Sequence, residues 1–338
     1  MPFVPCISEF VVLVCSEREV FFCPNFQFGE RFYMRRKNLW IDTDMGNDDL
    51  MALAMLAQYP QIKIQAISLV NGVSRVKKGL SNLKGVLEYL KLNPLLFEDT
   101  SIKIYPYKLE FPKQDINRAE ELTLLENLPI KPLATKADDL KNLLSNLPDL
   151  SVLLALGPLT NIANLMQSSP DLFKTKVTKI ILMGGGIEKG NVLPLRVAEY
   201  NIALDPEAAN VVFNFNLPIT MIGIDATCQV PCTEEYKQEV KKLKPDNPAG
   251  SVLQEMILNN EGDFDQFYDP LAAAILMKPE LIVDSLSGQI KIVGDDPKKA
   301  KTAFISKEGN TTVPLLIDQM QFFGLLNSYM IGFKNVSN

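Results

Sequence analysis

The sequence LWIDTDMGNDDLMAL, residues 39–53, places four carboxylates within eight positions, directly after an apolar run. They are Asp42, Asp44, Asp48 and Asp49. The apolar residues before Asp42 predict a buried strand, and DDLMALAMLAQYP, residues 48–60, predicts the helix that follows it. Carboxylates this close together repel one another, and burial makes each charge more costly. We therefore expect a positively charged group to lie among them.

The same alternation of strand and helix continues along the chain. Apolar, β-branched runs predict strands buried on both faces, and helical stretches separate them. The predicted strands include KIQAISLV (63–70), SVLLALG (151–157), KIILMGG (179–185) and PITMIGID (218–225). This order predicts an α/β fold with an open, doubly wound, mostly parallel sheet and helices on both faces, a Rossmann-like architecture. Ligands bind such sheets outside the carboxyl ends of the strands.

Composition narrows the function classes. Of the 338 residues, 47% are hydrophobic and 22% are charged, as in ordinary globular proteins. The net charge of −6, without long Lys/Arg runs, argues against a nucleic-acid partner. The chain contains no His, which excludes mechanisms that need an imidazole and His-based zinc sites. No apolar stretch approaches the ~20 residues of a membrane-spanning helix, so we expect no membrane partner.

The N-terminal region and the cysteines predict organisation and location. Residues 1–33 lack the basic start of a signal peptide, and MRRK (34–37) leads directly into the first predicted strand. We therefore expect 1–33 to be an extension outside the fold and 34–338 to form a single domain. The five cysteines form no CxxC pair, and their odd number disfavours a disulfide framework. Free thiols indicate a reducing compartment, so we expect a cytoplasmic protein.

The acidic cluster favours a metal site. Oxygen-only donors suit Ca²⁺ or Mg²⁺ rather than zinc, and the economical arrangement places Asp44 and one of Asp48 and Asp49 around the ion. Two alternatives remain open at this point. In one, Asp48 only caps the helix while Asp42 is solvated. In the other, the Asp-x-Asp pair belongs to a haloacid-dehalogenase-type phosphatase, although that pattern requires Thr or Val where Gly46 stands.

Four blocks, in family order, resemble the nucleoside hydrolases, the inosine/uridine-type N-ribohydrolases. IDTDMGNDDLMAL (41–53) resembles the family's Asp-x-Asp-Pro-Gly-x-Asp-Asp signature. The later blocks are ALGPLTNIA (155–163), LMGGGIEKGN (182–191) with AEYNIALDPEAANVVF (198–213), and YDPLAAA (268–274). The resemblance implies the family's α/β fold and the hydrolysis of the N-glycosidic bond of a ribonucleoside or related ribosyl compound with one Ca²⁺.

The resemblance also implies roles for individual residues. Asp44 is the expected base that deprotonates the attacking water, and Asp42 is expected to support the turn. The Ca²⁺ ligands implied are Asp44, Asp49, Asp269 and the backbone carbonyl of Thr160. The side chains implied to contact the ribose are Asp48, Met183, Asn191, Glu199 and Asn201. Family members are usually dimers or tetramers, so we expect a homodimer or homotetramer.

The sequence departs from the family where imidazoles are expected. Tyr268 replaces the His of one block, Cys228 replaces a second His, and the third has no counterpart. Met45 replaces a Pro, and the spacing from Asn191 to Glu199 is two residues longer. Tyr268 is the residue expected at the leaving group, by hydrogen bonding or stacking, although a phenol with a pKa near 10 is a poor acid at pH 7.

These departures leave two functions open. The first is an active Ca²⁺-dependent hydrolase with an altered leaving-group pocket. The second is a catalytically impaired ribosyl-ligand binding protein that retains the calcium site. The nucleobase preference is not readable from the sequence. We expect helix 248–259 and loop 260–267 to form a wall of the base pocket, with Phe264, Phe267 and Tyr268 either facing the base or packing in the core.

Overall fold

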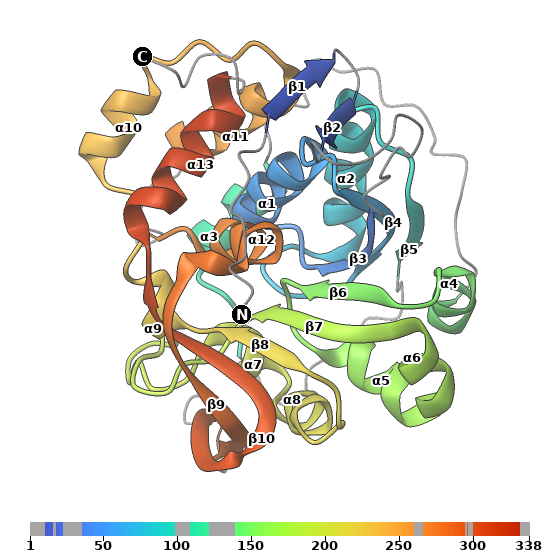
Figure 1. The fold of residues 1–338 in the computed structure, drawn as a ribbon. Helices are drawn as coiled ribbons and strands as arrows, with labels where there is room; N and C mark the ends of the chain where they lie inside the picture. The colour runs from blue at the N-terminus through green and yellow to red at the C-terminus, as the bar shows by residue number, and fades with distance from the viewer. Residues whose placement is uncertain are drawn as a thin grey trace, which may run out of the picture. The chain divides into compact units, whose positions relative to one another are not determined.

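An eight-stranded sheet organises the chain from Lys37 onward (Figure 1). In sheet order its strands are β5 (Leu95–Glu98), β4 (Ile62–Leu69), β3 (Lys37–Thr43), β6 (Ser151–Ala155), β7 (Val177–Met183), β8 (Ile219–Ile222), β10 (Lys301–Ile317) and β9 (Ile282–Val293). Neighbouring strands pair parallel except β9 and β10, which pair antiparallel. The predicted open, mostly parallel sheet is confirmed.

The computed structural model describes residues 11–15, 18–22, 36–98, 109–121, 139–259, 266–294, 296 and 300–331. The chain divides into two units, Met1–Arg36 and Lys37–Asn338. The described part of the first unit is an antiparallel hairpin of β1 (Val11–Cys15) and β2 (Arg18–Phe22). None of the described helices is long and apolar enough to cross a membrane.

Side chains that alternate along the strands build two apolar cores, one on each face of the sheet. Leu39 and Ile41 of β3 belong to one core and Trp40 to the other. The first core is covered by α1 (Asn47–Ala57), α2 (Val76–Tyr89), α11 (Pro248–Leu258), α12 (Tyr268–Met277) and α13 (Gln319–Ile331). The second is covered by α4 (Leu140–Asn146), α5 (Thr160–Ser168), α6 (Pro170–Lys176) and α8 (Pro206–Phe213). The predicted helices on both faces are therefore confirmed, and Figure 1 shows α5, α6 and α8 on the opposite side of β6 and β7 from α1 and α12.

Shorter helices occupy the connections between these elements. They are α3 (Lys113–Glu120), α7 (Tyr200–Leu204), α9 (Ile224–Thr227), α10 (Glu234–Val240) and a 3₁₀ turn at Pro279–Leu281. Two of them, α3 and α7, contribute to the site described below.

Strand β3 lies where the order of the sheet reverses. The chain passes from β3 to β4 and β5 on one side, and later continues through β6, β7 and β8 on the other. Connections that leave neighbouring strands in opposite directions open a crevice at their carboxyl ends. The four-aspartate segment directly follows β3, so the fold places it at this crevice.

The sequence did not predict the antiparallel pair β9–β10, which extends the sheet beyond β8. Its register shifts between Phe304 and Ser306. The pair also supports the glycine-rich loop after β7, because the Thr302 hydroxyl accepts a 2.7 Å hydrogen bond from Gly186 N and lies 2.6 Å from Gly186 O. The hairpin therefore helps to fix a loop that borders the site.

Candidate active site

Asp42 ties three elements together beneath the site. Its Oδ1 accepts hydrogen bonds from the Ser68 hydroxyl of β4 and from Asn161 Nδ2 of α5, the latter at 3.0 Å. The side chain is fully buried, and burial raises the pKa of the Asp42 carboxyl to about 7. Asp42 does not line the cavity described below. Its position suits the supporting role expected from the sequence.

Asp44 follows β3 and packs against the loop after β4. Its Oδ2 accepts a 2.8 Å hydrogen bond from Val73 N. A Cβ at Gly72 would lie 1.9 Å from that oxygen, so the glycine makes room for the carboxylate. The next residue, Met45, has a φ of 57°. Proline cannot adopt this angle, because its ring fixes φ near −65°. Met45 therefore suits the turn that this chain forms in place of the family's Pro.

Helix α1 begins directly after this turn, and Asp49 caps it. Asp49 Oδ2 accepts a 2.8 Å hydrogen bond from Gly46 N, and Asp49 Oδ1 accepts one from the Thr43 hydroxyl. A carboxylate in the first turn also suits the partial positive charge at a helix N-terminus. The capping role that the sequence left open for Asp48 is therefore met by Asp49.

Three buried carboxylates converge between α1 and α12. Asp48, Asp49 and Asp269 each offer one oxygen, and these oxygens lie within 4.8 Å of one another. Burial and the charge of Asp49 raise the pKa of Asp48 to about 8. Burial and the charges of Asp48, Asp49 and Asp44 raise the pKa of Asp269 well above its usual range. No ion pair joins these carboxylates to a described Lys or Arg.

This donor set fits a hard divalent cation. Asp269 Oδ1 and Asn47 Oδ1 are buried and have no hydrogen-bond partner among the described residues. Carboxylate and amide oxygens are the ligands that Ca²⁺ and Mg²⁺ prefer. A bound cation would give these oxygens a partner and offset the repulsion between the carboxylates. Asp48, which the sequence assigned to the ribose, belongs to this group, and Asp44 lies close enough for its charge to act on Asp269.

Polar side chains after β7 form the neighbouring part of the site. Glu199 accepts hydrogen bonds from Gly185 N at 2.9 Å, Asn201 N at 2.9 Å and Ile202 N at 3.2 Å, and so caps α7. Burial raises the pKa of Glu199 to about 7. Asn201 Nδ2 donates to Leu156 O at 3.0 Å, which joins α7 to the end of β6. Backbone partners thus hold both side chains in place.

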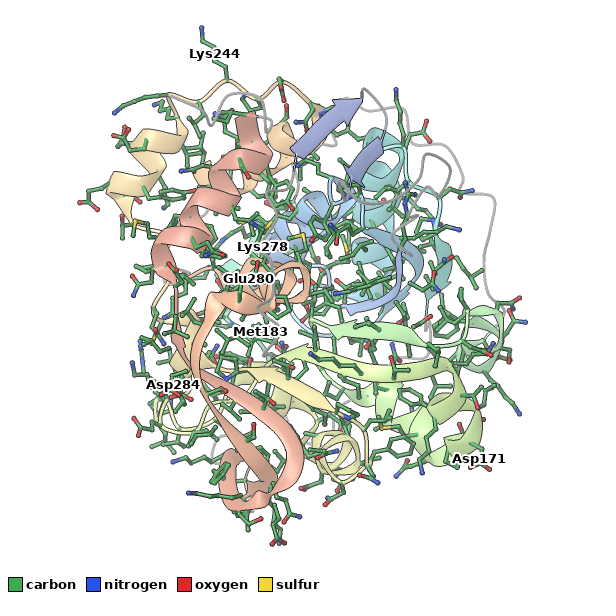
Figure 2. The ribbon with its side chains drawn as sticks, viewed as in Figure 1. Asp171, Met183, Lys244, Lys278, Glu280 and Asp284 are labelled. Carbon is green, nitrogen blue, oxygen red and sulfur yellow. The ribbon has the colours of Figure 1, made fainter. Side chains whose placement is uncertain are left out.

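Asn191 and Met183 complete this part. Asn191 Oδ1 accepts a 3.1 Å hydrogen bond from Tyr200 N, despite the longer spacing between Asn191 and Glu199. Met183, labelled in Figure 2, lies at the carboxyl end of β7, beside α12. Its backbone O accepts a 3.2 Å hydrogen bond from Asn201 Nδ2.

The loop between β7 and Asn191 is held from outside the site. Asp225 accepts hydrogen bonds from the backbone N–H groups of Ile187, Glu188 and Lys189 at 2.6–3.1 Å. Lys189 Nζ lies 3.0 Å from Cys228 Sγ. Asp225 and Cys228 do not line the cavity, although Cys228 stands at a family His position.

Nine of the ten predicted site residues line one open cavity. They are Asp44, Asp48, Asp49, Met183, Asn191, Glu199, Asn201, Tyr268 and Asp269. The tenth, Thr160, starts α5, and its hydroxyl donates a 2.5 Å hydrogen bond to Asp205 Oδ2. Thr160 does not line this cavity, so ligation by its carbonyl stays a prediction.

Sequence reasoning missed the wall that α3 contributes. Phe111, Asp115, Arg118 and Ala119 line the cavity from this segment. Arg118 Nη2 donates a 2.8 Å hydrogen bond to Asp115 Oδ1, and both side chains are largely buried. The opposite charges three residues apart were the available signal, since that spacing places two side chains on one helical face.

The expectations for the base pocket meet different outcomes. Tyr268, at the start of α12, lines the cavity. Phe267 is 1% exposed and packs among Tyr236, Phe322 and Phe323 with ring centroids 5.7–6.0 Å away, so it belongs to the core. The expectation that helix 248–259 forms a wall is wrong, because α11 packs on α1 and α13 and lines no part of this cavity. Phe264 and most of loop 260–267 lie outside the described residues.

A buried carboxylate group beside Asn and Glu side chains, at the switch point of a doubly wound sheet, defines a site for a small polar ligand and a hard cation. The family described as "Inosine-uridine preferring nucleoside hydrolase" matches residues 39–324. The chain therefore belongs to the nucleoside hydrolase family. The predicted family and the predicted enzyme class, the N-ribohydrolases, are confirmed.

Relatives match over nearly the whole chain. The pyrimidine-specific ribonucleoside hydrolase RihB of Escherichia coli (strain SE11) is 27% identical over 320 residues, which cover 89% of this chain and 99% of that protein. The RihB of Escherichia fergusonii matches to the same extent.

Solved structures show the same fold. The inosine-uridine preferring nucleoside hydrolase of Bacillus anthracis superposes with a TM-score of 0.73 at 21% identity, covering 87% of this chain and 99% of that one. The purine-preferring ribonucleoside hydrolase of Gardnerella vaginalis gives a TM-score of 0.69 at 22% identity, covering 89% and 100%. The predicted fold is therefore confirmed.

Proposed function

We propose that the protein hydrolyses the N-glycosidic bond of a ribonucleoside or related ribosyl compound, with Asp44 as the base and Ca²⁺ as the metal. One observation carries the proposal: nine residues predicted from separate motifs line one cavity, and three of them, Asp48, Asp49 and Asp269, are convergent buried carboxylates. Asp49 and Asp269 would hold the ion, with Asp44 and Asp48 as neighbouring oxygen donors.

When bound, Ca²⁺ lowers the pKa of a bound water and orients the ribose diol. Asp44 accepts the proton of the attacking water. Asp48, Asn191, Glu199 and Asn201 hold the ribose hydroxyls. Cleavage at C1′ passes through an oxocarbenium-like state, as in O-glycoside hydrolysis. The carboxylates around the sugar stabilise the positive charge that develops there.

A catalytically impaired binding protein is the second candidate, and one observation favours it. The cavity contains no imidazole, and Tyr268 is the only described lining residue with a hydroxyl group. A phenol is a poor general acid at pH 7, and general acid catalysis is typically worth about 10²–10⁴-fold. A protein without another way to activate the leaving group would bind a nucleoside and turn it over slowly.

Release of free ribose separates the two candidates. The wild-type protein is incubated with Ca²⁺ and each of uridine, cytidine, inosine, adenosine and guanosine, and reducing sugar is measured. The proposal predicts turnover of at least one nucleoside. Binding of a nucleoside, measured by calorimetry, with no ribose released would establish the second candidate instead.

We also propose that residues 34–338 form the catalytic domain, that 1–33 are an extension, and that the protein is a cytoplasmic homodimer or homotetramer. The free thiols of Cys228 and Cys232, among the described residues, support the location, and the family resemblance supports the oligomer. Light scattering of the full chain and of a chain starting at Met34 tests this organisation. An unfolded truncated chain, or a monomer, would contradict it.

A further inference from the structure

Among its described lining residues, the cavity has one positively charged side chain. Six of its described lining residues carry carboxyl groups, and Arg118 is the single Lys or Arg among them. The carboxyl groups belong to Asp44, Asp48, Asp49, Asp115, Glu199 and Asp269. Nothing in the proposed sugar chemistry uses Arg118. A mostly buried guanidinium in a catalytic cavity therefore needs a role of its own.

Contacts at both ends fix the helix that carries Arg118. At its start, Phe111 stacks on Tyr200, with ring centroids 4.5 Å apart and planes 20° apart. At its end, Ala119 O accepts a 3.0 Å hydrogen bond from Asn82 Nδ2 of α2, and Glu120 Oε1 accepts one of 3.2 Å from Arg75 N. Helix α3 therefore connects the ribose side of the site with α2.

Asp115 orients the guanidinium itself. The Arg118 Nη2–Asp115 Oδ1 distance is 2.8 Å, and the two side chains are 16% and 14% exposed. A guanidinium carries five N–H donors in a rigid planar fork, so the bond to Asp115 restricts how that plane can turn.

We place the base of a nucleoside bound through its ribose on the α3 side of the cavity. The carboxylate group and the side chains after β7 occupy the sugar side. The remaining described lining residues include apolar ones, Val73, Phe111, Ala119 and Leu156, which suit the faces of a base. Arg118 is the charged donor on this side and suits the polar edge of a base.

We propose that Arg118, positioned by Asp115, binds the nucleobase at a carbonyl oxygen and stabilises the negative charge that develops when the base leaves. This inference rests on the proposed hydrolase function. Arg118 would thereby take over the leaving-group role that no imidazole can fill in this chain.

The step balances without a proton from Arg118. The water oxygen bonds to C1′ and its proton passes to Asp44, while the C1′–N bond breaks and its electron pair moves onto the base. The charge spreads to the carbonyl oxygen, where charged hydrogen bonds from Arg118 stabilise it. The departed base then takes a proton from solvent. Arginine does not lose its own proton in proteins, so it acts here by electrostatics and not as an acid.

A donor-only group also selects among bases. Uracil O4 and hypoxanthine O6 are carbonyl oxygens, whereas cytosine N4 and adenine N6, at the same ring positions, are amino donors. We therefore expect uridine to be preferred over cytidine and inosine over adenosine, and Arg118 to be the source of both preferences.

The test compares substrates whose leaving groups differ in how much stabilisation they need as they depart as anions. In Arg118→Met, kcat/KM for uridine and inosine should fall about 10²–10³-fold, as when an oxyanion donor is removed. For 4-nitrophenyl β-ribofuranoside, whose leaving group is stable as an anion, it should fall far less. Arg118→Lys keeps the positive charge but loses the planar fork of N–H donors. Its kcat/KM should lie between those of the wild-type protein and Arg118→Met.

Lys244→Met is the matched control, because it also removes a cationic side chain and Lys244 is exposed and lies outside the cavity. The control should change kcat/KM by no more than a few-fold for any substrate, and thermal melting should show that every variant is folded. Equal losses of kcat/KM for nucleosides and for the aryl riboside in Arg118→Met would show a structural role. That result would overturn this inference and leave the proposed function standing. Nucleoside 5′-phosphates are assayed alongside the nucleosides. A loss of kcat/KM confined to these phosphates would show a phosphate site and would also overturn the inference. A wild-type protein inactive on both substrate types would overturn the proposed function.

Discussion

The two walls of the cavity are built in different ways. On the sugar side, Asp44 and Met183 are at or directly after the ends of sheet strands, so the register of the core sets their places. On the other side, Arg118 lies on α3, an eight-residue helix in which Ala119 is the only fully buried residue. The comparison suggests that the chemistry of the α3 wall can change without disturbing the sheet. Arg118, in a chain without His, is consistent with such a change.

The largest expected effect comes from removing the proposed base, Asp44, on the sugar side of the cavity. Asp44→Asn should lower kcat by about 10²–10⁴-fold, because an amide cannot accept the proton of water. The side-chain carbonyl can still accept the bond from Val73 N, so the loop should keep its place. The loss should be similar for all nucleosides and for an aryl riboside. It is measured by ribose release or nitrophenol absorbance, and full activity in Asp44→Asn would reject the base assignment.

That asymmetry also explains what the sequence could predict. Asp44, Asp49 and Asp269 were recognisable because short motifs at strand and helix ends carry both the fold signal and the chemistry. Arg118 was missed because α3 is short and mostly polar, and its only apolar residues, Ile116 and Ala119, are too few to place it in the fold. Phe267 adjoins a cavity residue in sequence, yet the core buries it, and sequence alone could not decide between these places. The β9–β10 pair was missed because its half-exposed strands lack the continuous apolar runs of the parallel strands.

The next effect concerns the carboxylate group. Calcium at 100 times its Kd should stabilise the wild-type protein by about 2.7 kcal/mol and raise its melting temperature by several degrees. Asp269→Asn should abolish that shift. It should still fold without calcium, because it removes one charge from a buried carboxylate cluster. Differential scanning calorimetry checks both points, and an undiminished calcium shift in the variant would remove Asp269 from the metal site.

A smaller effect is expected at the ribose contacts. Asn201→Ala removes the side-chain donor to the carbonyls of Leu156 and Met183 and removes a ribose partner. We expect kcat/KM to fall about 10–100-fold, from about 1–3 kcal/mol, equally for uridine and inosine. Asn214→Ala is the matched control, because Asn214 bonds Asn210 O on an exposed helix end. Steady-state kinetics measure this loss. A loss of kcat/KM that differs between uridine and inosine would contradict the assignment of the sugar and the nucleobase to different walls.

The smallest effect tests the α3 wall. Phe111→Leu keeps an apolar side chain but removes the stack on Tyr200, which is worth about 0.5–1.5 kcal/mol. Nucleoside KM should rise a few-fold, and differently for purines and pyrimidines. Phe215→Leu, at an edge-to-face contact with Phe173 away from the cavity, serves as the control. Identical changes for every base would show that Phe111 only supports the fold.

Calcium dependence of ribose release tests the central claim most directly. The protein is depleted of metal with a chelator, and release from its best nucleoside is followed before and after Ca²⁺ is returned, with Mg²⁺ added in a parallel sample. The account predicts that depletion abolishes turnover and that Ca²⁺ restores it. Undiminished turnover after complete depletion would contradict the metal site at Asp49 and Asp269 and the mechanism built on it.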